Sequence, residues 1–132
     1  MSNLFIFTDG GSRGNPGPAA LGVYVSDDQG QVIFEEGQQG ETLFGILQGE
    51  IELWVNGKVV ETLFAGDVFG EGALVQPDRT RASTAIAKTD CLLAIMDQAR
   101  FLFAVQQTPM FALEVLKSYS DRLRRMKHNL WG

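Results

Sequence analysis

The chain has 132 residues, of which 45% are hydrophobic and 20% charged, with a formal net charge of −5. This length predicts a single domain, 1–132, that buries a core of its own. The acidic balance argues against a surface that binds nucleic acid. No apolar run reaches the roughly 18 residues of a membrane span, and the N-terminus lacks the basic segment of a secretory signal. With one cysteine, Cys91, no internal disulfide is available, so we expect a cytoplasmic protein.

The same composition excludes most catalytic chemistry. The only histidine is His128 and the only cysteine is Cys91. A zinc site with the usual nitrogen and sulfur ligands is therefore nearly excluded. A serine or cysteine nucleophile would have to recruit His128, which stands close to the C-terminus, where a base is poorly preorganised. We expect binding without catalysis, metal or cofactor.

The N-terminal segment, 1–29, is predicted to form two strands, 4–7 and LGVYVS, around a loop rich in glycine and proline. Residues 3–28 resemble the first β-hairpin of the ribonuclease H family through the run FTDGGSRGNPGPAALGVYV. In that family the position of Asp9 carries one of several carboxylates that hold two divalent metal ions. No later residue matches the other carboxylates, so metal-dependent ribonuclease activity through Asp9 is the least favoured function. We interpret Asp9 as a turn residue.

A region of short strands follows from Gly30. Regularly spaced glycines separate runs rich in β-branched and aromatic residues, namely QVIFEE, TLFGIL, EIELWV, KVVETLF and DVF. This pattern predicts a β-sandwich, roll or barrel. Asn56-Gly57 predicts a type I′ hairpin turn, because both residues tolerate positive φ. The run STAIAKTDCLLAIM predicts two further strands, broken at 88–90.

Two helices are expected after the strands. Asp97 is a plausible N-cap for QARFLFAVQQ, and Thr108-Pro109 ends that helix and starts the last one. The last helix carries leucines seven residues apart, which predict either a face packed on the sheet or a helix–helix homodimer; they are Leu116, Leu123 and Leu130. Its basic cluster is interpreted as a solvated face rather than a nucleic-acid patch; it comprises Arg122, Arg124, Arg125 and Lys127.

From Gly30 to about Lys127 the sequence resembles the cyclic nucleotide-binding domain family. The run GQVIFEEGQQGETLFGILQGEIELWVNGKVVETLFAGDVFGE follows that family's order of strands and glycines, and its end matches the motif G-D-x-F-G-E. Arg81 comes ten residues after Glu71 and is followed by ASTA, where the family has R-x-A-T-A or similar. The resemblance implies a mainly β fold with C-terminal helices: a β-roll or jelly roll at 30–96, helices at 97–132, and the N-terminal hairpin completing the roll.

The resemblance also implies a ligand site in the segment 66–84. Arg81 would bind the cyclic phosphodiester with two parallel N–H donors, and Glu71 would accept a hydrogen bond from the ribose 2′-hydroxyl. Backbone amides of a short helix at 70–74 would add donors. Ala82 after Arg81 resembles the pattern associated with cyclic AMP over cyclic GMP. The full expected set, whose last three members are candidates for purine contact, is Phe69, Gly70, Glu71, Gly72, Ala73, Arg81, Ala82, Ser83, Arg122, Arg125 and Met126.

Alternatives remain open from the sequence alone. Glu71 and Arg81 could form an ion pair that closes a turn, which would leave a structural scaffold or a dimerising domain with a vestigial pocket. Gly72 replaces the larger apolar residue usual after F-G-E, and Thr80 stands where the family often has proline before the arginine. Because the chain carries two resemblances, we also hypothesise a recombined or engineered origin.

Overall fold

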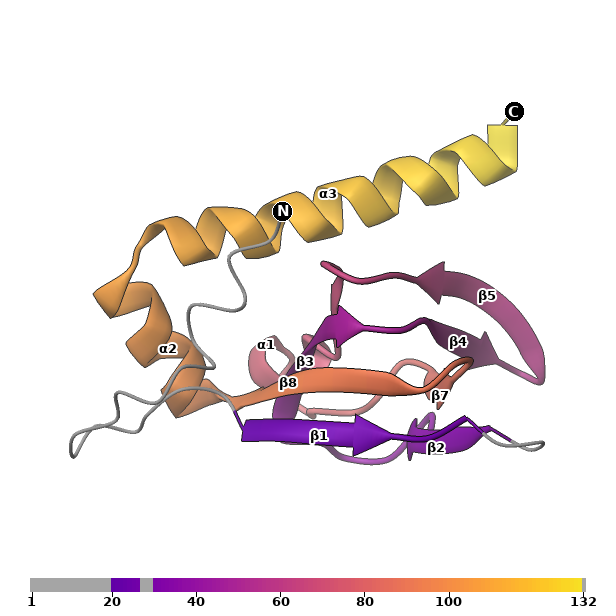
Figure 1. Cartoon of the computed structure of the whole chain (residues 1–132). Helices are drawn as coiled ribbons and strands as arrows, with labels where there is room; N and C mark the ends of the chain where they lie inside the picture. The colour runs from indigo at the N-terminus through magenta and orange to yellow at the C-terminus, as the bar shows by residue number, and fades with distance from the viewer. Residues whose placement is uncertain (1–19, 27–29, 132) are drawn as a thin grey trace.

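The computed structural model describes residues 20–26 and 30–131 of the chain (Figure 1). The expected mainly β fold with C-terminal helices is confirmed. In chain order the elements are β1 (Ala20–Tyr24), β2 (Gln31–Phe34), β3 (Thr42–Gln48), β4 (Ile51–Val55), β5 (Lys58–Leu63), β6 (Val68–Phe69), α1 (Gly72–Val75), β7 (Thr84–Ala87), β8 (Cys91–Asp97), α2 (Gln98–Gln107) and α3 (Met110–Trp131).

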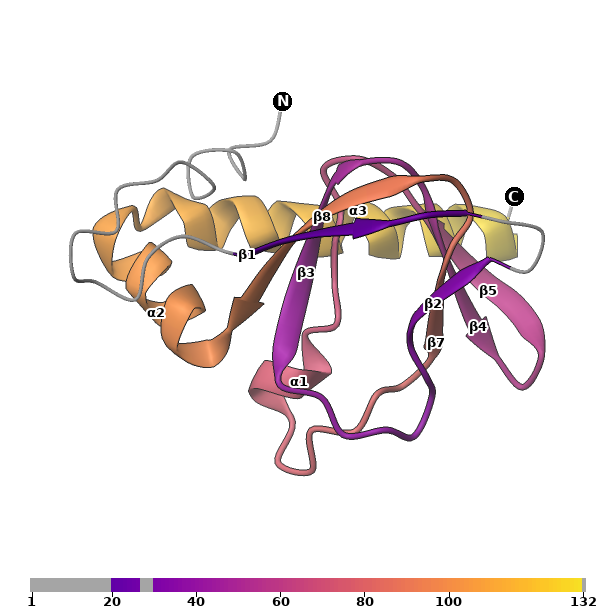
Figure 2. The same cartoon turned by 60° about the horizontal axis from the view of Figure 1, so that its bottom comes forward.

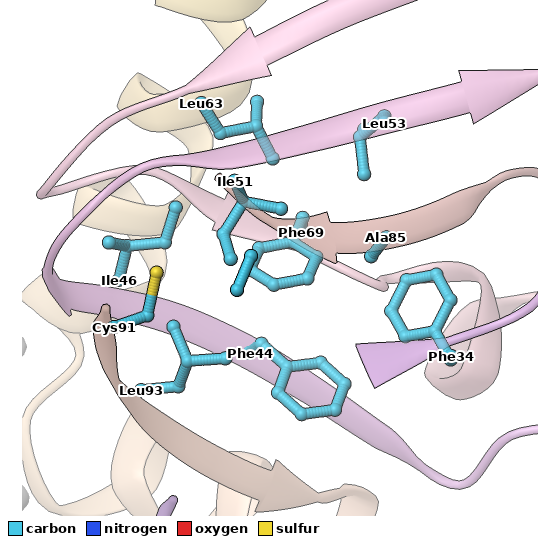
Figure 3. Packing of buried hydrophobic residues seen from close by; sticks show 11 residues of the cluster. Phe34, Phe44, Ile46, Ile51, Leu53, Leu63, Phe69, Ala85, Cys91 and Leu93 are labelled. Carbon is cyan, nitrogen blue, oxygen red and sulfur yellow. The ribbon is translucent and has the colours of Figure 1, made fainter. Parts of the chain in front are cut away.

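The strands form two four-stranded sheets, in the orders β1-β8-β3-β6 and β2-β7-β4-β5. All their pairings are antiparallel. Between the sheets lies an apolar core that includes three phenylalanines, whose rings lie 5.2 to 5.9 Å apart (Figure 3); they are Phe34, Phe44 and Phe69. The same core buries the free thiol of Cys91. A second core lies where α2 and α3 cover the first sheet.

The hydrophobic patterns of β3 and β4 match the burial of these two strands in the fold. β3 is buried along most of its length, because Phe44 and Ile46 enter the core between the sheets while Leu43 and Leu47 pack toward the helices. A strand covered on both faces reads as a continuous apolar run. β4 instead alternates between buried and half-buried residues, as expected of a strand with one wetter face.

Several local predictions are confirmed. Asn56 and Gly57 join β4 to β5 with φ of 52° and 77°, as a type I′ turn requires. The Asp97 side chain accepts a hydrogen bond from the Arg100 backbone N–H at 2.9 Å and so caps α2. The short helix begins at Gly72, two residues later than expected.

Only part of the N-terminal expectation can be compared with the fold. The predicted strand over LGVYVS is present as β1, which pairs with β8 from Ala20 opposite Ile95 to Tyr24 opposite Cys91. The first strand of the expected hairpin, its loop and Asp9 lie outside the described residues.

The predicted packing of the leucine stripe on the sheet is wrong. Leu116, Leu123 and Leu130 are 63%, 54% and 78% exposed. The face of α3 that packs inward is another one, with a mixed apolar and polar composition; it consists of Phe111, Val115, Ser118 and Arg122. These residues follow helical spacing and lie about a quarter-turn or more from the leucines around the helix axis. None of the helices in the described part of the chain combines the length and hydropathy needed to cross a bilayer.

Candidate functional site

A cavity of about 420 Å³ opens beside α1, at one end of the roll. Eight of the eleven residues expected at a ligand site line it: Phe69, Gly70, Glu71, Gly72, Arg81, Ala82, Ser83 and Arg122. They come from β6, α1, the segment that leads into β7, and α3. The fold therefore brings Arg81 and Glu71 to one cavity, although ten residues separate them in the sequence.

Gly70 turns the chain between β6 and α1. Its φ is +84°, a conformation that other residues rarely adopt. A Cβ at this position would lie 2.9 Å from Arg81 Nη1. The turn places Glu71 at the N-cap of α1, so its side chain begins at the rim of the cavity.

The backbone of Arg81 is held by the loop between β2 and β3. Arg81 N–H donates to the Gln38 carbonyl at 2.8 Å, and Gly37 N–H donates to the Arg81 carbonyl at 2.9 Å. Figure 2 shows this loop running beside the segment between α1 and β7. Gly40 in the same loop lies against the Arg81 guanidinium, and a Cβ there would collide with it. The guanidinium is thus packed directly against the backbone.

The Arg81 side chain is 6% exposed and incompletely hydrogen-bonded. Its Nη1 donates to the carbonyl oxygens of Thr42 at 2.9 Å and Gly70 at 3.1 Å. Its Nη2 lies 3.4 Å from the Thr42 hydroxyl, while the buried Nε has no hydrogen-bond partner among the residues that the structure describes. The guanidinium stacks over the Phe34 ring, 4.2 Å from its centroid. Burial lowers the pKa of Arg81, and the charge of Glu71 only partly opposes that effect.

The alternative in which Arg81 and Glu71 form a turn-closing ion pair is not what the structure holds. Across residues 20–26 and 30–131, Arg81 forms no ion pair within 4.0 Å with any carboxylate. Glu71 Oε1 instead accepts a hydrogen bond from the Tyr119 hydroxyl at 2.8 Å. Burial, together with the charge of Glu71, raises the pKa of Tyr119 well above its usual range. In the described part of the chain, therefore, no carboxylate lies within ion-pair distance of Arg81, and Glu71 acts on its charge only from farther away.

Sequence reasoning missed Tyr119. This residue precedes Arg122 by one turn of α3 and so shares its side of the helix. The Arg122 guanidinium lies 4.8 Å from the centroid of the Tyr119 ring. A tyrosine one turn from a cavity-lining arginine is the signal that could have identified it.

The prediction that Arg122 belongs to a solvated face is wrong. Its Nε and Nη2 each donate to one oxygen of Glu61 at 2.7 Å, and its Nη1 donates to the Val68 carbonyl at 2.8 Å. Burial disfavours its charge, but the hydrogen bonds and charge of Glu61 prevail, so the pKa of Arg122 is raised. Arg122 docks α3 onto β5 and β6 because a long arginine fork can satisfy a buried carboxylate there. Arg122 lines the cavity, but each of its three guanidinium nitrogens already makes a hydrogen bond within the protein.

The remaining three expected residues do not line this cavity. Ala73 is buried in α1, with 2% of its surface exposed. Arg125 and Met126 line a different cavity, of about 770 Å³, between β5 and α3. Arg125 Nη2 also lies 2.6 Å from an oxygen of the buried Asp67 carboxylate, an ion pair that anchors the helix.

Comparison with known proteins identifies the family. The family model for the cyclic nucleotide-binding domain matches residues 25–108, more than half of the chain. The chain belongs to this family. A Pycsar effector protein of Xanthomonas perforans, XpPycTIR, is 32% identical over 109 residues, which are 83% of this chain and 36% of that protein. The cAMP-dependent protein kinase regulatory subunit of Eremothecium gossypii is 34% identical over 73 residues, 55% of this chain and 16% of that subunit.

Solved structures agree with the fold. The Thermus thermophilus catabolite activator protein superposes with a TM-score of 0.67 at 24% identity, covering 85% of this chain and 53% of that one. The cAMP-bound protein PfPKA-R superposes with a TM-score of 0.61 at 26% identity, covering 82% of this chain and 37% of that one. The chain spans between 9% and 36% of the length of these curated relatives.

The family match begins at residue 25. The likeness of residues 3–28 to ribonuclease H and the recombined or engineered origin find no support in these matches. Both stay predictions.

Proposed function

We propose that this chain is a non-catalytic module that binds a cyclic nucleotide in the cavity beside α1, with Arg81 on the cyclic phosphate. One observation carries the proposal. Among residues 20–26 and 30–131, no carboxylate pairs with the buried Arg81, and its Nε has no hydrogen-bond partner. A buried cation left in this state is costly unless an anion completes it, and a cyclic phosphodiester supplies one negative charge with two exposed oxygens.

The rest of the cavity suits the rest of such a ligand. Ala82 and Ser83, at the cavity wall, follow Arg81 directly and would supply backbone N–H groups and one hydroxyl for the phosphate. Glu71, at the rim, would accept the ribose 2′-hydroxyl. Phe34 and Leu53 give apolar surface for a purine. The volume lies within the usual range for small-molecule sites.

We propose cyclic AMP as the preferred ligand. Ala82, rather than threonine, offers no side-chain hydroxyl to the exocyclic amine of guanine. Neighbours of both kinds exist: one solved structure at 26% identity is cAMP-bound, and another at 25% identity comes from a cyclic-GMP-dependent signalling pathway. The two nucleotides must therefore be compared directly.

Calorimetric titration tests the proposal. The wild-type chain is expected to bind cyclic AMP more tightly than cyclic GMP, and both more tightly than 5′-AMP. Arg81→Ala should weaken cyclic AMP binding about a hundredfold, because two charge-assisted hydrogen bonds are lost. Arg79→Asn is the matched control, since Arg79 is exposed, outside the cavity lining, and has a φ of 54° that asparagine tolerates. No heat from any cyclic nucleotide, or equal losses in both variants, would contradict the proposal.

A second candidate function is homodimerisation through α3. Leu116, Leu123 and Leu130 form an exposed apolar stripe along the helix, which a second copy of the chain could cover. Sedimentation of wild type against the double variant Leu116→Glu/Leu123→Glu tests it. A concentration-dependent dimer that the variant abolishes supports the stripe as the interface, whereas a monomer at all concentrations, or a dimer in both proteins, refutes it.

A further inference from the structure

The carboxylate proposed to meet the ribose has an oxygen already engaged by α3. The Tyr119 hydroxyl donates to Glu71 Oε1 at 2.8 Å, across 48 residues of sequence. Within the part of the chain that the structure describes, the other oxygen, Oε2, has no hydrogen-bond or ion-pair partner. A carboxylate accepts bonds at both oxygens, so one can be held while the other stays open.

Tyr119 is itself held from two sides. Its ring packs against the core cluster beneath α2 and α3. The Arg122 guanidinium lies 4.8 Å from the ring centroid, and Glu61 fixes that guanidinium with two bonds of 2.7 Å. A ring fixed by packing and by a cation holds its hydroxyl at a defined place. The hydroxyl is a donor at neutral pH, as in any tyrosine, and burial and Glu71 raise the pKa of Tyr119 further.

Glu71 has no such support of its own. Its residue is largely exposed, and it precedes a helix of only four residues. An unsupported glutamate samples several rotamers, and ordering such a side chain on binding opposes binding through lost rotamer entropy. The contact with Tyr119 removes much of that cost before any ligand arrives.

We propose that Tyr119 is a positioning residue: its hydroxyl holds Glu71 Oε1 so that Oε2 faces the ribose 2′-hydroxyl of a bound cyclic nucleotide. The inference rests on the proposed function and concerns the recognition of the sugar. It predicts that Tyr119 acts only through Glu71 and only on ligands that carry a 2′-hydroxyl. Glu71 would then link the ligand to α3, with one carboxylate oxygen on the ribose and the other on Tyr119.

The test compares cyclic AMP with 2′-deoxy cyclic AMP by calorimetry. Wild type is expected to prefer the ribose ligand about tenfold, the worth of one hydrogen bond to a charged group. Tyr119→Phe removes the hydroxyl and keeps the ring, so this preference should fall to about threefold or less while the affinity for the deoxy ligand stays within about twofold. Tyr24→Phe, at the other tyrosine of the chain, should change neither value.

A double-mutant cycle completes the test. Glu71→Gln should abolish the preference, and adding Tyr119→Phe to it should change the preference no further. Equal weakening of both ligands by Tyr119→Phe, tighter binding of cyclic AMP, or an effect that persists in Glu71→Gln would overturn the role of Tyr119 alone. No binding by the wild type would instead overturn the proposed function beneath it.

Discussion

Arg81 and Arg122 are both buried, with 6% and 8% of their surfaces exposed, yet their surroundings treat the charge in opposite ways. Arg122 meets both oxygens of Glu61 at 2.7 Å and a carbonyl at 2.8 Å. Arg81 donates to two carbonyl oxygens and has a weak contact with a hydroxyl, and its Nε meets no acceptor on any residue that the structure describes. The pKa of Arg122 is raised by Glu61, whereas burial lowers the pKa of Arg81.

The difference separates a structural arginine from a binding one. A buried charge that is paired and fully hydrogen-bonded contributes to the assembly of the fold, and its removal strands its partner. A buried charge without a counterion is retained at a free-energy cost, and residues of that kind concentrate at functional sites. Arg122 completes the contact between α3 and the roll, whereas the counterion that we propose for Arg81 is the phosphate of a ligand.

The largest effect is expected from Arg122→Ala. Because it leaves the Glu61 carboxylate buried without a counterion, the free energy of unfolding should fall by about 3–5 kcal/mol. Denaturant titration measures this loss. Arg124→Ala, at an exposed neighbouring position, should change stability by no more than about 0.5 kcal/mol. Similar values for the two variants would show that Arg122 does not dock the helix.

Arg81→Met is expected to lower the affinity for cyclic nucleotide and to leave the stability of the fold nearly unchanged. Replacing an unpaired buried cation by an apolar chain of similar length is expected to leave the free energy of unfolding within about 1 kcal/mol of wild type or to raise it. Cyclic nucleotide affinity should nevertheless fall about a hundredfold. Denaturant titration and calorimetry on the same variant separate the two quantities. A stability loss as large as that of Arg122→Ala would show that Arg81 stabilises the fold in the same way as Arg122.

Gly40→Ala is expected to displace the Arg81 guanidinium without removing its charge. A Cβ at Gly40 collides with the Arg81 guanidinium, so the fork must shift and cyclic AMP affinity should fall about tenfold. Gly37→Ala in the same loop is the control: it is strained by a φ of +88°, but its Cβ meets nothing within 4 Å. That variant should lose stability and keep affinity. If Gly37→Ala weakened cyclic AMP binding more than Gly40→Ala, the close packing of Gly40 against the guanidinium would not be needed for binding.

The smallest effect concerns Tyr119 at alkaline pH. An unfolded tyrosine ionises near pH 10, while burial and Glu71 keep the folded one protonated, with the Arg122 charge in partial opposition. The unfolded state therefore loses the proton first, and the stability that Tyr119 contributes decreases as pH rises above 10, by up to about 1.4 kcal/mol per pH unit.

Denaturant titrations at pH 9 and pH 11 measure this effect. Wild type should lose more stability over that interval than Tyr119→Phe. Tyr24, whose pKa burial also raises, contributes equally to both proteins. Parallel losses would show that the Tyr119 hydroxyl is not buried against Glu71.

The sequence allowed the roll to be predicted from local turn signals, and most residues that line the cavity from the resemblance to a known family. Asn56-Gly57 fixes a hairpin by its own φ angles, and the segment from Gly70 to Arg81 carries the site within a dozen residues. The docking face of α3 could not be predicted in this way. Its polar anchors find partners far along the chain, as Arg122 does in Glu61, 61 residues away. Hydrophobic periodicity instead selects the exposed leucines.

Nuclear magnetic resonance of the arginine Nε–H groups can show whether the ligand phosphate binds Arg81. The Arg81 signal, assigned by its loss in Arg81→Met, should move downfield when cyclic AMP is added, because the unpaired Nε–H gains an acceptor. The Arg122 signal, already bonded to Glu61, should stay where it is. An Arg81 signal unchanged at a saturating concentration of cyclic AMP would contradict the assignment of this arginine to the phosphate.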